Sequence, residues 1–224
     1  MFLKYAPLAG ALLFAGAAQA QVGITADLGT TGAGFHLVVP MESNLNGRFG
    51  ANYFQHDFDR TTNKLDYAIK GKLQTFDILF DWYVREGSPF RLTGGLVYNG
   101  NRFDAIAKAS PSGTYNLNGD IYPASLVGTV KGRIEYRKAA PYLGIGWGNA
   151  LAANNASHWS FNADLGAFFQ GNPNVSLGNW GCSSLAVICN LIANDVAAER
   201  LRLKDDVDGF KVYPVVRASV AYRF

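Results

Sequence analysis

The chain of 224 residues has little of the chemistry on which most enzymes and metal proteins depend. It has three histidines and two cysteines, and its formal net charge is only +3. The histidines, His36, His56 and His158, show no helical metal-ligand spacing, so we expect no metal site. No Gly-rich phosphate loop follows a strand, so no cofactor is expected. The small charge gives no reason to expect a nucleic-acid partner.

Long apolar runs are lacking as well. After residue 20, no stretch is apolar for the roughly 20 residues that a membrane-spanning helix needs. Yet 49% of the residues are hydrophobic and 13% are aromatic. This composition fits either a soluble globule or a β-barrel, in which apolar residues occupy every second position of each strand. The length fits one domain.

The first 20 residues have the pattern of an export signal. Lys4 precedes an apolar run from Leu8 to Ala18, and Ala18-Gln19-Ala20 is a small-x-small cleavage site. We therefore expect a cleaved signal peptide at 1–20 and a single mature domain at 21–224. In an exported chain, Cys182 and Cys189 are expected to form a disulfide.

The dominant pattern after residue 20 is an alternation of apolar and polar residues with period two. In residues 74–84, aromatic and aliphatic side chains occupy every second position, and Asp77 and Asp81 lie between them. Such alternation is typical of strands with one apolar face. We expect strands at about 22–39, 45–57, 67–84, 90–99, 122–137, 141–150, 158–170 and 210–224.

The two faces of these strands favour an all-β, transmembrane antiparallel barrel. An aromatic-rich face suits lipid, and a charged face suits an interior in which side chains pair with one another. We therefore expect Val130, Ile134 and Leu165 to face hydrocarbon. The charges expected to face the lumen are Arg48, Asp77, Asp81, Arg91, Lys131, Arg133, Glu135, Asp164, Arg217 and Arg223.

The expected number of strands is eight, with ten as the alternative. With eight, the turns 40–44, 85–89 and 137–141 would all face outwards, which reverses the usual short periplasmic turns and long outer loops. Extra strands at 22–29 and about 173–179 would give ten and restore that rule.

The last strand carries a more specific signal. In "VRASVAYRF", Val216, Ala218, Val220, Tyr222 and Phe224 share one face, and Phe224 is the final residue. The stretch resembles the assembly signal of small outer-membrane β-barrel proteins of Gram-negative bacteria. That resemblance implies an outer-membrane location. It also implies the assembly machinery, outer-membrane lipid and lipopolysaccharide as partners.

One segment is not strand-like. Within a last long loop at about 171–209, residues 195–208 are predicted to form one short helix, capped by Asn194 or Asp195 and ended by Gly209. The segment is interpreted either as a decorated loop or as a plug or surface-binding element.

The best candidate for catalysis is a His-x-Ser pair, His158 and Ser160, which share a strand face. The pair resembles that of outer-membrane lipid A deacylases, but the nearest acid, Asp164, lies roughly 13 Å from Ser160 along the strand. We therefore expect a non-enzymatic barrel of the cell envelope with a structural or surface-interaction role. A narrow porin-like channel and a lipid A-modifying hydrolase are the alternatives.

Overall fold

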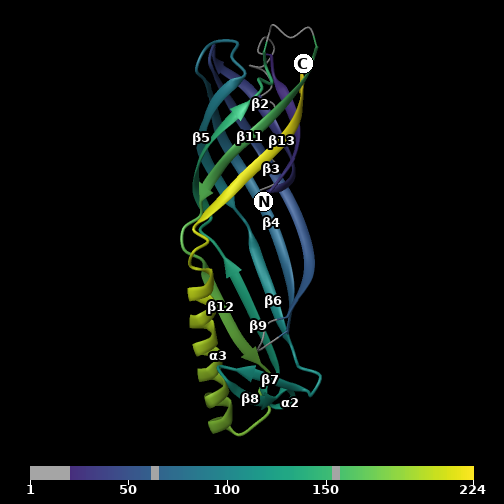
Figure 1. The fold of residues 1–224 in the computed structure, drawn as a ribbon, viewed down its shortest axis with the longest axis vertical. Helices are drawn as coiled ribbons and strands as arrows, with labels where there is room; N and C mark the ends of the chain where they lie inside the picture. The colour runs from purple at the N-terminus through teal and green to yellow at the C-terminus, as the bar shows by residue number, and fades with distance from the viewer. Residues whose placement is uncertain (1–20, 62–65, 153–156) are drawn as a thin grey trace, which may run out of the picture.

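The computed structural model describes residues 21–61, 66–152 and 157–224, so the predicted signal peptide at 1–20 lies outside the described residues. The molecule is elongated and has two parts, a closed barrel and an extension that continues from one end of it (Figure 1). Within the described residues, neither helix has the length and apolarity that crossing a membrane would require.

The barrel is a ring of eight antiparallel strands, which confirms the expected fold class. It closes because β1 pairs with β13 and β4 pairs with β5. Closure gives every strand in the ring two neighbours, so its backbone groups are satisfied without water. In order around the ring, the strands are β1 (Gly23–Gly29), β2 (Gly32–Glu42), β3 (Leu45–Thr61), β4 (Asp66–Tyr83), β5 (Phe90–Asn99), β10 (Ala139–Trp147), β11 (Trp159–Phe169) and β13 (Val212–Arg223).

The extension grows from β3 and β4, which run on together beyond the barrel. There β4 pairs with β6 (Arg102–Lys108), which pairs with β9 (Thr129–Glu135), which pairs with β12 (Asn174–Trp180). The helix α3 (Ala186–Val207) packs along β12 and runs back from the far end towards the barrel (Figure 1). A separate hairpin of β7 (Thr114–Leu117) and β8 (Asp120–Pro123) covers the far end, together with the single turn α2 (Ala124–Val127).

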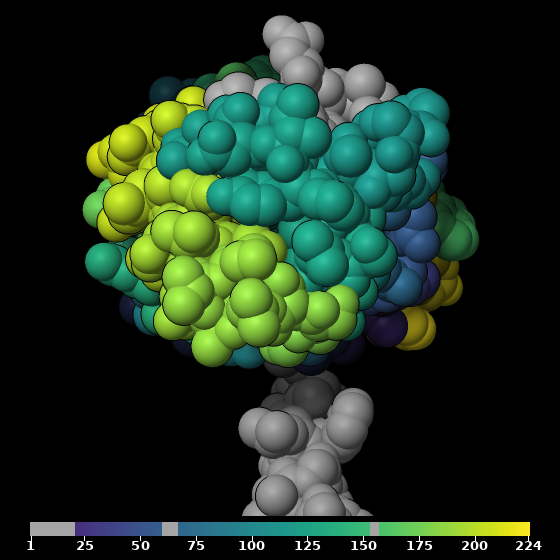
Figure 2. Space-filling view, turned by 90° about the horizontal axis from the view of Figure 1, so that it is seen from below, coloured from purple at the N-terminus to yellow at the C-terminus, as the bar shows by residue number. Residues whose placement is uncertain are grey.

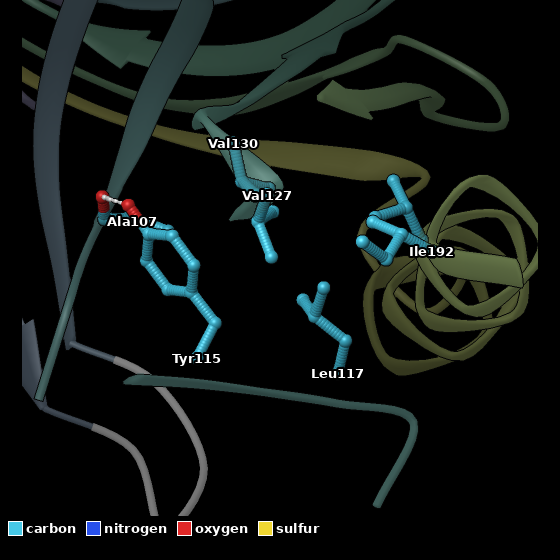
Figure 3. Close-up of a cluster of buried hydrophobic side chains, with 7 residues drawn as sticks. Ala107, Tyr115, Leu117, Val127, Val130 and Ile192 are labelled. Carbon is cyan, nitrogen blue, oxygen red and sulfur yellow. Dashed lines mark hydrogen bonds between the residues drawn. The ribbon is translucent and has the colours of Figure 1, made fainter. Parts of the chain in front are cut away.

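The extension has its own hydrophobic core. Side chains from the sheet, the hairpin, α2 and α3 converge there, and Leu117 and Ile192 are fully buried (Figure 3). Seen from its far end, the extension shows side chains of the hairpin region lying against those of the first turns of α3 (Figure 2). The buried members of this core are Ala107, Tyr115, Leu117, Val127, Val130, Ile192 and Val196.

The number of barrel strands matches the expectation of eight, but two strands of the ring were assigned wrongly. Residues 22–39 form two strands, β1 and β2, joined by a two-residue turn at Thr30 and Thr31. Gly32 has a φ of 101° there, and a Cβ would lie 2.5 Å from the carbonyl oxygen of Tyr53. Conversely, residues 122–137 do not enter the ring, because β9 lies in the extension. One error adds a strand to the ring and the other removes one, so the number of barrel strands stays at eight.

This correction also reverses the predicted sides of two turns. The turns at 40–44 and 85–89 lie at the end of the barrel that holds Phe224, and the connections after β5 and β11 lie at the other end with the extension. The usual division into short turns and long loops is met for the two connections that form the extension. It is not met by the two-residue turn at Thr30 and Thr31, which lies at the extension end, or by the connection 148–158, which lies at the end with Phe224. The residues proposed as an extra strand, 173–179, form β12 of the extension.

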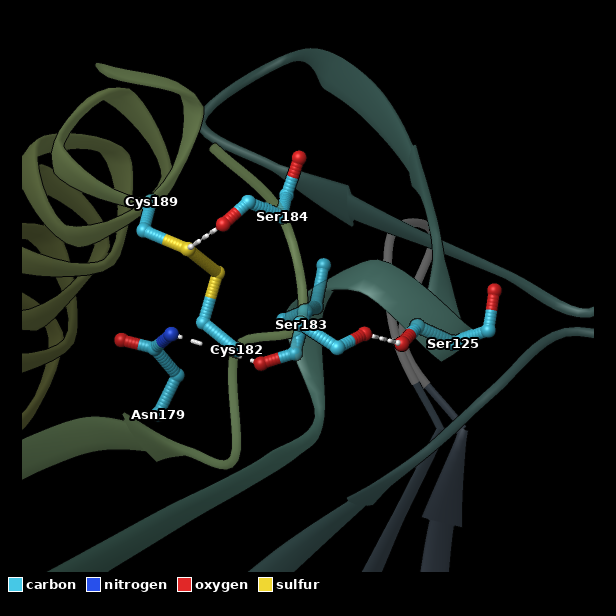
Figure 4. The surroundings of a disulfide bond; sticks show 7 residues. Ser125, Asn179, Cys182, Ser183, Ser184 and Cys189 are labelled. Carbon is cyan, nitrogen blue, oxygen red and sulfur yellow. Dashed lines mark hydrogen bonds between the residues drawn. A yellow bond between two sulfur atoms is a disulfide. The ribbon is translucent and has the colours of Figure 1, made fainter. Parts of the chain in front are cut away.

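The helix is longer than expected. It has 22 residues and begins at Ala186, so Asn194 and Asp195 lie inside it and do not cap it. Asp195 instead accepts hydrogen bonds from the Tyr122 hydroxyl and the Asn118 amide. The predicted disulfide between Cys182 and Cys189 is confirmed and ties the segment after β12 to the first turn of α3 (Figure 4). Because α3 packs on β12, it is not a plug of the lumen.

Candidate functional site

The middle of the barrel lumen is filled by two clusters of buried charges. In the first, Arg48 donates two hydrogen bonds to Asp164, at 3.0 and 3.1 Å, and one to Asp81 at 3.1 Å. Arg91 donates to the same Asp164 at 2.6 Å. Two cations balance two carboxylates in this cluster. Because the four side chains come from four different strands, their bonds connect opposite parts of the barrel wall across the lumen.

The second cluster is centred on His36. Its Nδ1 lies 2.7 Å from Asp27 and its Nε2 lies 3.0 Å from Asp77, so each ring nitrogen faces a carboxylate. Arg217 donates to Asp77 at 2.8 Å and lies 3.4 Å from Asp27. All four side chains are almost fully buried. Charged groups this deep in a protein are stable only when paired in this way.

Buried apolar side chains lie on either side of these charges. Towards the extension, Phe168 stacks on Tyr213 at 4.8 Å, above the buried Leu79 and Val97. Towards the other end, Val38 packs with Ala150 and Ala221. A cavity lined by Arg48, Asp81 and Arg91 has a volume of about 10 Å³, room for one water molecule at most.

The predicted lumen charges divide into two groups. Lys131, Arg133 and Glu135 were predicted wrongly, because they lie on β9 in the extension and not in the barrel. Asp27 and His36 belong to the lumen but were not predicted, because 22–39 was assigned as one continuous strand. The remaining predicted charges lie on barrel strands and are buried: Arg48, Asp77, Asp81, Arg91, Asp164, Arg217 and Arg223.

The candidate catalytic pair is not assembled as a dyad. His158 Nδ1 lies 2.9 Å from the carbonyl oxygen of Arg223. The hydroxyl of Ser160 is buried and makes no hydrogen bond within the part of the chain that the structure describes. Asp164, the nearest acid, is engaged by Arg48 and Arg91.

The outer surface of the barrel is an apolar band that ends sharply where the extension begins. On β4, Phe76, Ile78 and Phe80 point outwards and are exposed. Beyond Gln74, polar residues take the outward positions and apolar residues take the inward ones. Lys72 and Lys70 point outwards, and Ile69 and Tyr67 lie on the inner face. The same inversion occurs on β3 after Tyr53, where Asp57 and Asp59 take the outward positions. The surroundings of these strands therefore change from apolar to aqueous at one level.

Comparisons with known proteins identify the class of fold. No family model matches the chain, and no curated protein sequence matches it. The crystal structure of CarO from Acinetobacter baumannii matches with a TM-score of 0.56 and 22% identity, over 91% of this chain and 98% of that one. CarO2 from Acinetobacter baumannii matches with a TM-score of 0.56 and 20% identity, over 92% and 100%. The fold is that of a small outer-membrane β-barrel protein. A major outer membrane protein from Thermus thermophilus also matches, with a TM-score of 0.41 and 18% identity, over 92% of this chain and 100% of that one.

In an outer-membrane barrel, outward residues of the band face lipid. Leu165 lies in this band, on β11. The same expectation is wrong for Val130, which is fully buried in the extension core, and for Ile134, which lies on the inner face of the extension sheet.

Proposed function

We propose that the protein is a non-enzymatic outer-membrane barrel that does not conduct solutes and that displays its extension for a structural or surface-interaction role. The observation that carries this proposal is the filled lumen. A solute would have to pass the buried apolar side chains and two clusters of paired charges, and an eight-stranded ring is only wide enough to be filled by its own side chains.

The position of the extension supports a role at the cell surface. Phe224 and the extension lie at opposite ends of the barrel (Figure 1). If the end with Phe224 faces the periplasm, as the assembly-signal resemblance implies, the hairpin and α3 stand outside the cell. Outer-membrane lipid, lipopolysaccharide and the assembly machinery are the partners that this placement requires.

The alternatives find less support in the geometry. A porin-like channel needs an open path, and the charged side chains of the lumen are bonded to each other across it. A hydrolase needs a serine activated by an oriented base. Here His158 faces a backbone carbonyl, and Asp164, the nearest acid along the strand, is held by two arginines.

Conductance in planar bilayers tests the proposal. Reconstituted wild-type protein is expected to give no regular conductance steps. A gel-shift assay of heat-modifiability on the same preparation shows that folded barrel is present, so a silent bilayer cannot be mistaken for missing protein. Regular steps from the wild type would overturn the closed barrel in favour of the narrow channel.

A further inference from the structure

A group of cationic side chains lies where the apolar band of the barrel gives way to the charged face of the extension. Lys72 on β4 is directly opposite Arg102 on β6, so both point outwards from one row of the sheet. Arg137 follows two residues after Glu135, which is opposite Arg102, and lies nearer the barrel. We call Lys72, Arg102 and Arg137 the basic row. Its members come within reach of one ligand, because opposed Cα atoms are about 5 Å apart and two residues span about 7 Å.

The charges of the basic row are only partly neutralised by the protein. Arg102 pairs with Asp104 at 2.8 Å, and the carboxylate of Glu135 is opposite Arg102 in the same row. With the described residues, neither Lys72 nor Arg137 forms an ion pair; Lys72 lies over the ring of Tyr53. Cations farther out on the same sheet face do pair: Lys108 lies 2.8 Å from Asp59, and Arg133 lies 2.6 Å from Asp104.

The opposite rim of the barrel carries as many acids as arginines. Its two short turns carry Glu42 and Glu86 with Arg85, Arg223 is buried at the same level, and the described residues of that rim include no lysine. On the extension side, Lys138 and Lys211 are exposed at the same rim as the basic row, and Lys211 pairs with Asp208 at 2.9 Å. Basic groups are thus concentrated at one of the two levels where the barrel leaves its apolar surroundings.

Directly below the basic row, the wall is apolar. Phe76 and Tyr98 are opposite each other on β4 and β5, their rings 6.0 Å apart, and both are about half exposed. A ligand held at this place therefore meets cations at one end and an aromatic wall at the other. That combination matches a phosphorylated lipid better than a free anion, since arginine and lysine bind phosphate oxygens while acyl chains lie on apolar surface.

We propose that the basic row binds the phosphate groups of the glycolipid in the outer leaflet, with the acyl chains of that lipid along Phe76 and Tyr98. This inference rests on the proposed function, which turns the extension towards the outside of the cell. It assigns lipopolysaccharide a particular place on the barrel, at the foot of the extension.

Binding of purified bisphosphorylated lipid A to the detergent-solubilised full chain, measured by native mass spectrometry, tests the proposal. The double variant Lys72→Gln with Arg137→Gln is expected to bind about tenfold more weakly than the wild type, because two charge-assisted contacts are lost. The matched control, Lys108→Gln with Lys131→Gln, removes the same charge from the same sheet face farther from the band and should bind as the wild type does.

Three results would overturn it. These are equal binding by the Lys72/Arg137 variant, equal weakening by the control, and equal binding of lipid A stripped of both phosphates. Inorganic phosphate supplied alone should not compete at the same concentration; competition would instead indicate a site for free anions. The binding assay depends neither on conductance nor on the orientation of the protein in cells. A negative binding result therefore leaves the proposed function intact, and the conductance experiment tests that function separately.

Discussion

Arg48 and Asp164 are 116 residues apart in the chain, yet their side chains meet in the lumen through two hydrogen bonds of 3.0 and 3.1 Å. Asp164→Asn removes the charge that balances Arg48 and Arg91 without changing the size of the side chain. Since breaking a buried ion pair leaves an uncompensated charge, the free energy of unfolding should fall by about 3–5 kcal/mol. Urea unfolding in lipid vesicles measures the loss.

Asp104→Asn is the matched control for that change. Asp104 also pairs with two arginines, accepting a hydrogen bond from Arg133 and lying 2.8 Å from Arg102, but on the outer face of the extension, where solvent screens the pairs. Its effect on unfolding should be far smaller. Equal effects of the two substitutions would mean that the lumen cluster does not hold the barrel together.

A second prediction distinguishes lipid from water at two similarly exposed positions. Leu165 on the barrel is 56% exposed and Ile106 on the extension is 47% exposed. Leu165→Arg should cost about 2–4 kcal/mol of folding free energy, because it places a charge in the apolar band. Ile106→Arg should change it by less than about 0.5 kcal/mol. Similar costs in vesicle folding titrations would contradict the boundary at Tyr53 and Gln74.

The direction of the barrel in the membrane is testable with single cysteines. Asp206→Cys on α3 should react with a membrane-impermeant maleimide in intact cells, because residue 206 is exposed. The native cysteines are joined in a disulfide, so they should not react. Glu86→Cys, in the turn at the opposite end, should react only after the outer membrane is permeabilised. The reverse labelling pattern would show that the extension lies in the periplasm.

Alkaline pH should weaken the extension through Tyr122. Its hydroxyl donates to Asp195 at 2.5 Å, and this bond, helped by burial, raises the pKa of Tyr122 from 10.0 to about 12. A raised pKa favours the protonated tyrosine in the folded state. The contribution to stability is therefore complete below pH 10 and is lost as the pH rises through about 12.

Absorbance titration of tyrosinate measures this. The difference between the wild type and Tyr122→Phe should show one group with a midpoint near the raised value. In the background of Asp195→Asn the midpoint should move back towards that of a free tyrosine. An unmoved midpoint would show that the hydrogen bond to Asp195 is not the cause.

The proposed assembly signal remains to be tested. The Phe224 N–H donates to the carbonyl oxygen of Val22 at 2.9 Å and its ring meets Tyr222 edge-on, so the residue joins the wall of the barrel. Phe224→Ala should lower the amount of heat-modifiable protein in the outer membrane without stopping export. Leu201→Ala, an exposed apolar residue on α3, is the control and should leave that amount unchanged. Equal amounts in both variants would remove Phe224 from the signal.

The sequence predicted the barrel because period-two alternation is a local pattern, as at Phe76 to Trp82. It did not predict the extension, because strands such as β3 and β4 continue through the boundary with only the sense of the alternation inverted. That inversion could have been recognised in the sequence, since Asp57 and Lys70 occupy positions that would otherwise face lipid. The hairpin turn at Thr30 was also signalled, by the glycines that flank it. The pairing of His36 with Asp27 and Asp77 was not signalled, because β1 and β2 were assigned as one strand and Asp77 lies two strands from His36, where only the curvature of the ring brings the side chains together.

The pairing of β3 with β4 runs without a shift in register from Leu45 opposite Trp82 to Thr61 opposite Asp66. The barrel and the extension therefore share one ladder of hydrogen bonds, with no linker between them at which to bend. From Tyr53 to Thr61 the ladder rises about 27 Å along the strand direction. A molecule bound at the far end of the extension is consequently held at a fixed distance from the bilayer. A force applied there would be transmitted directly to the barrel wall.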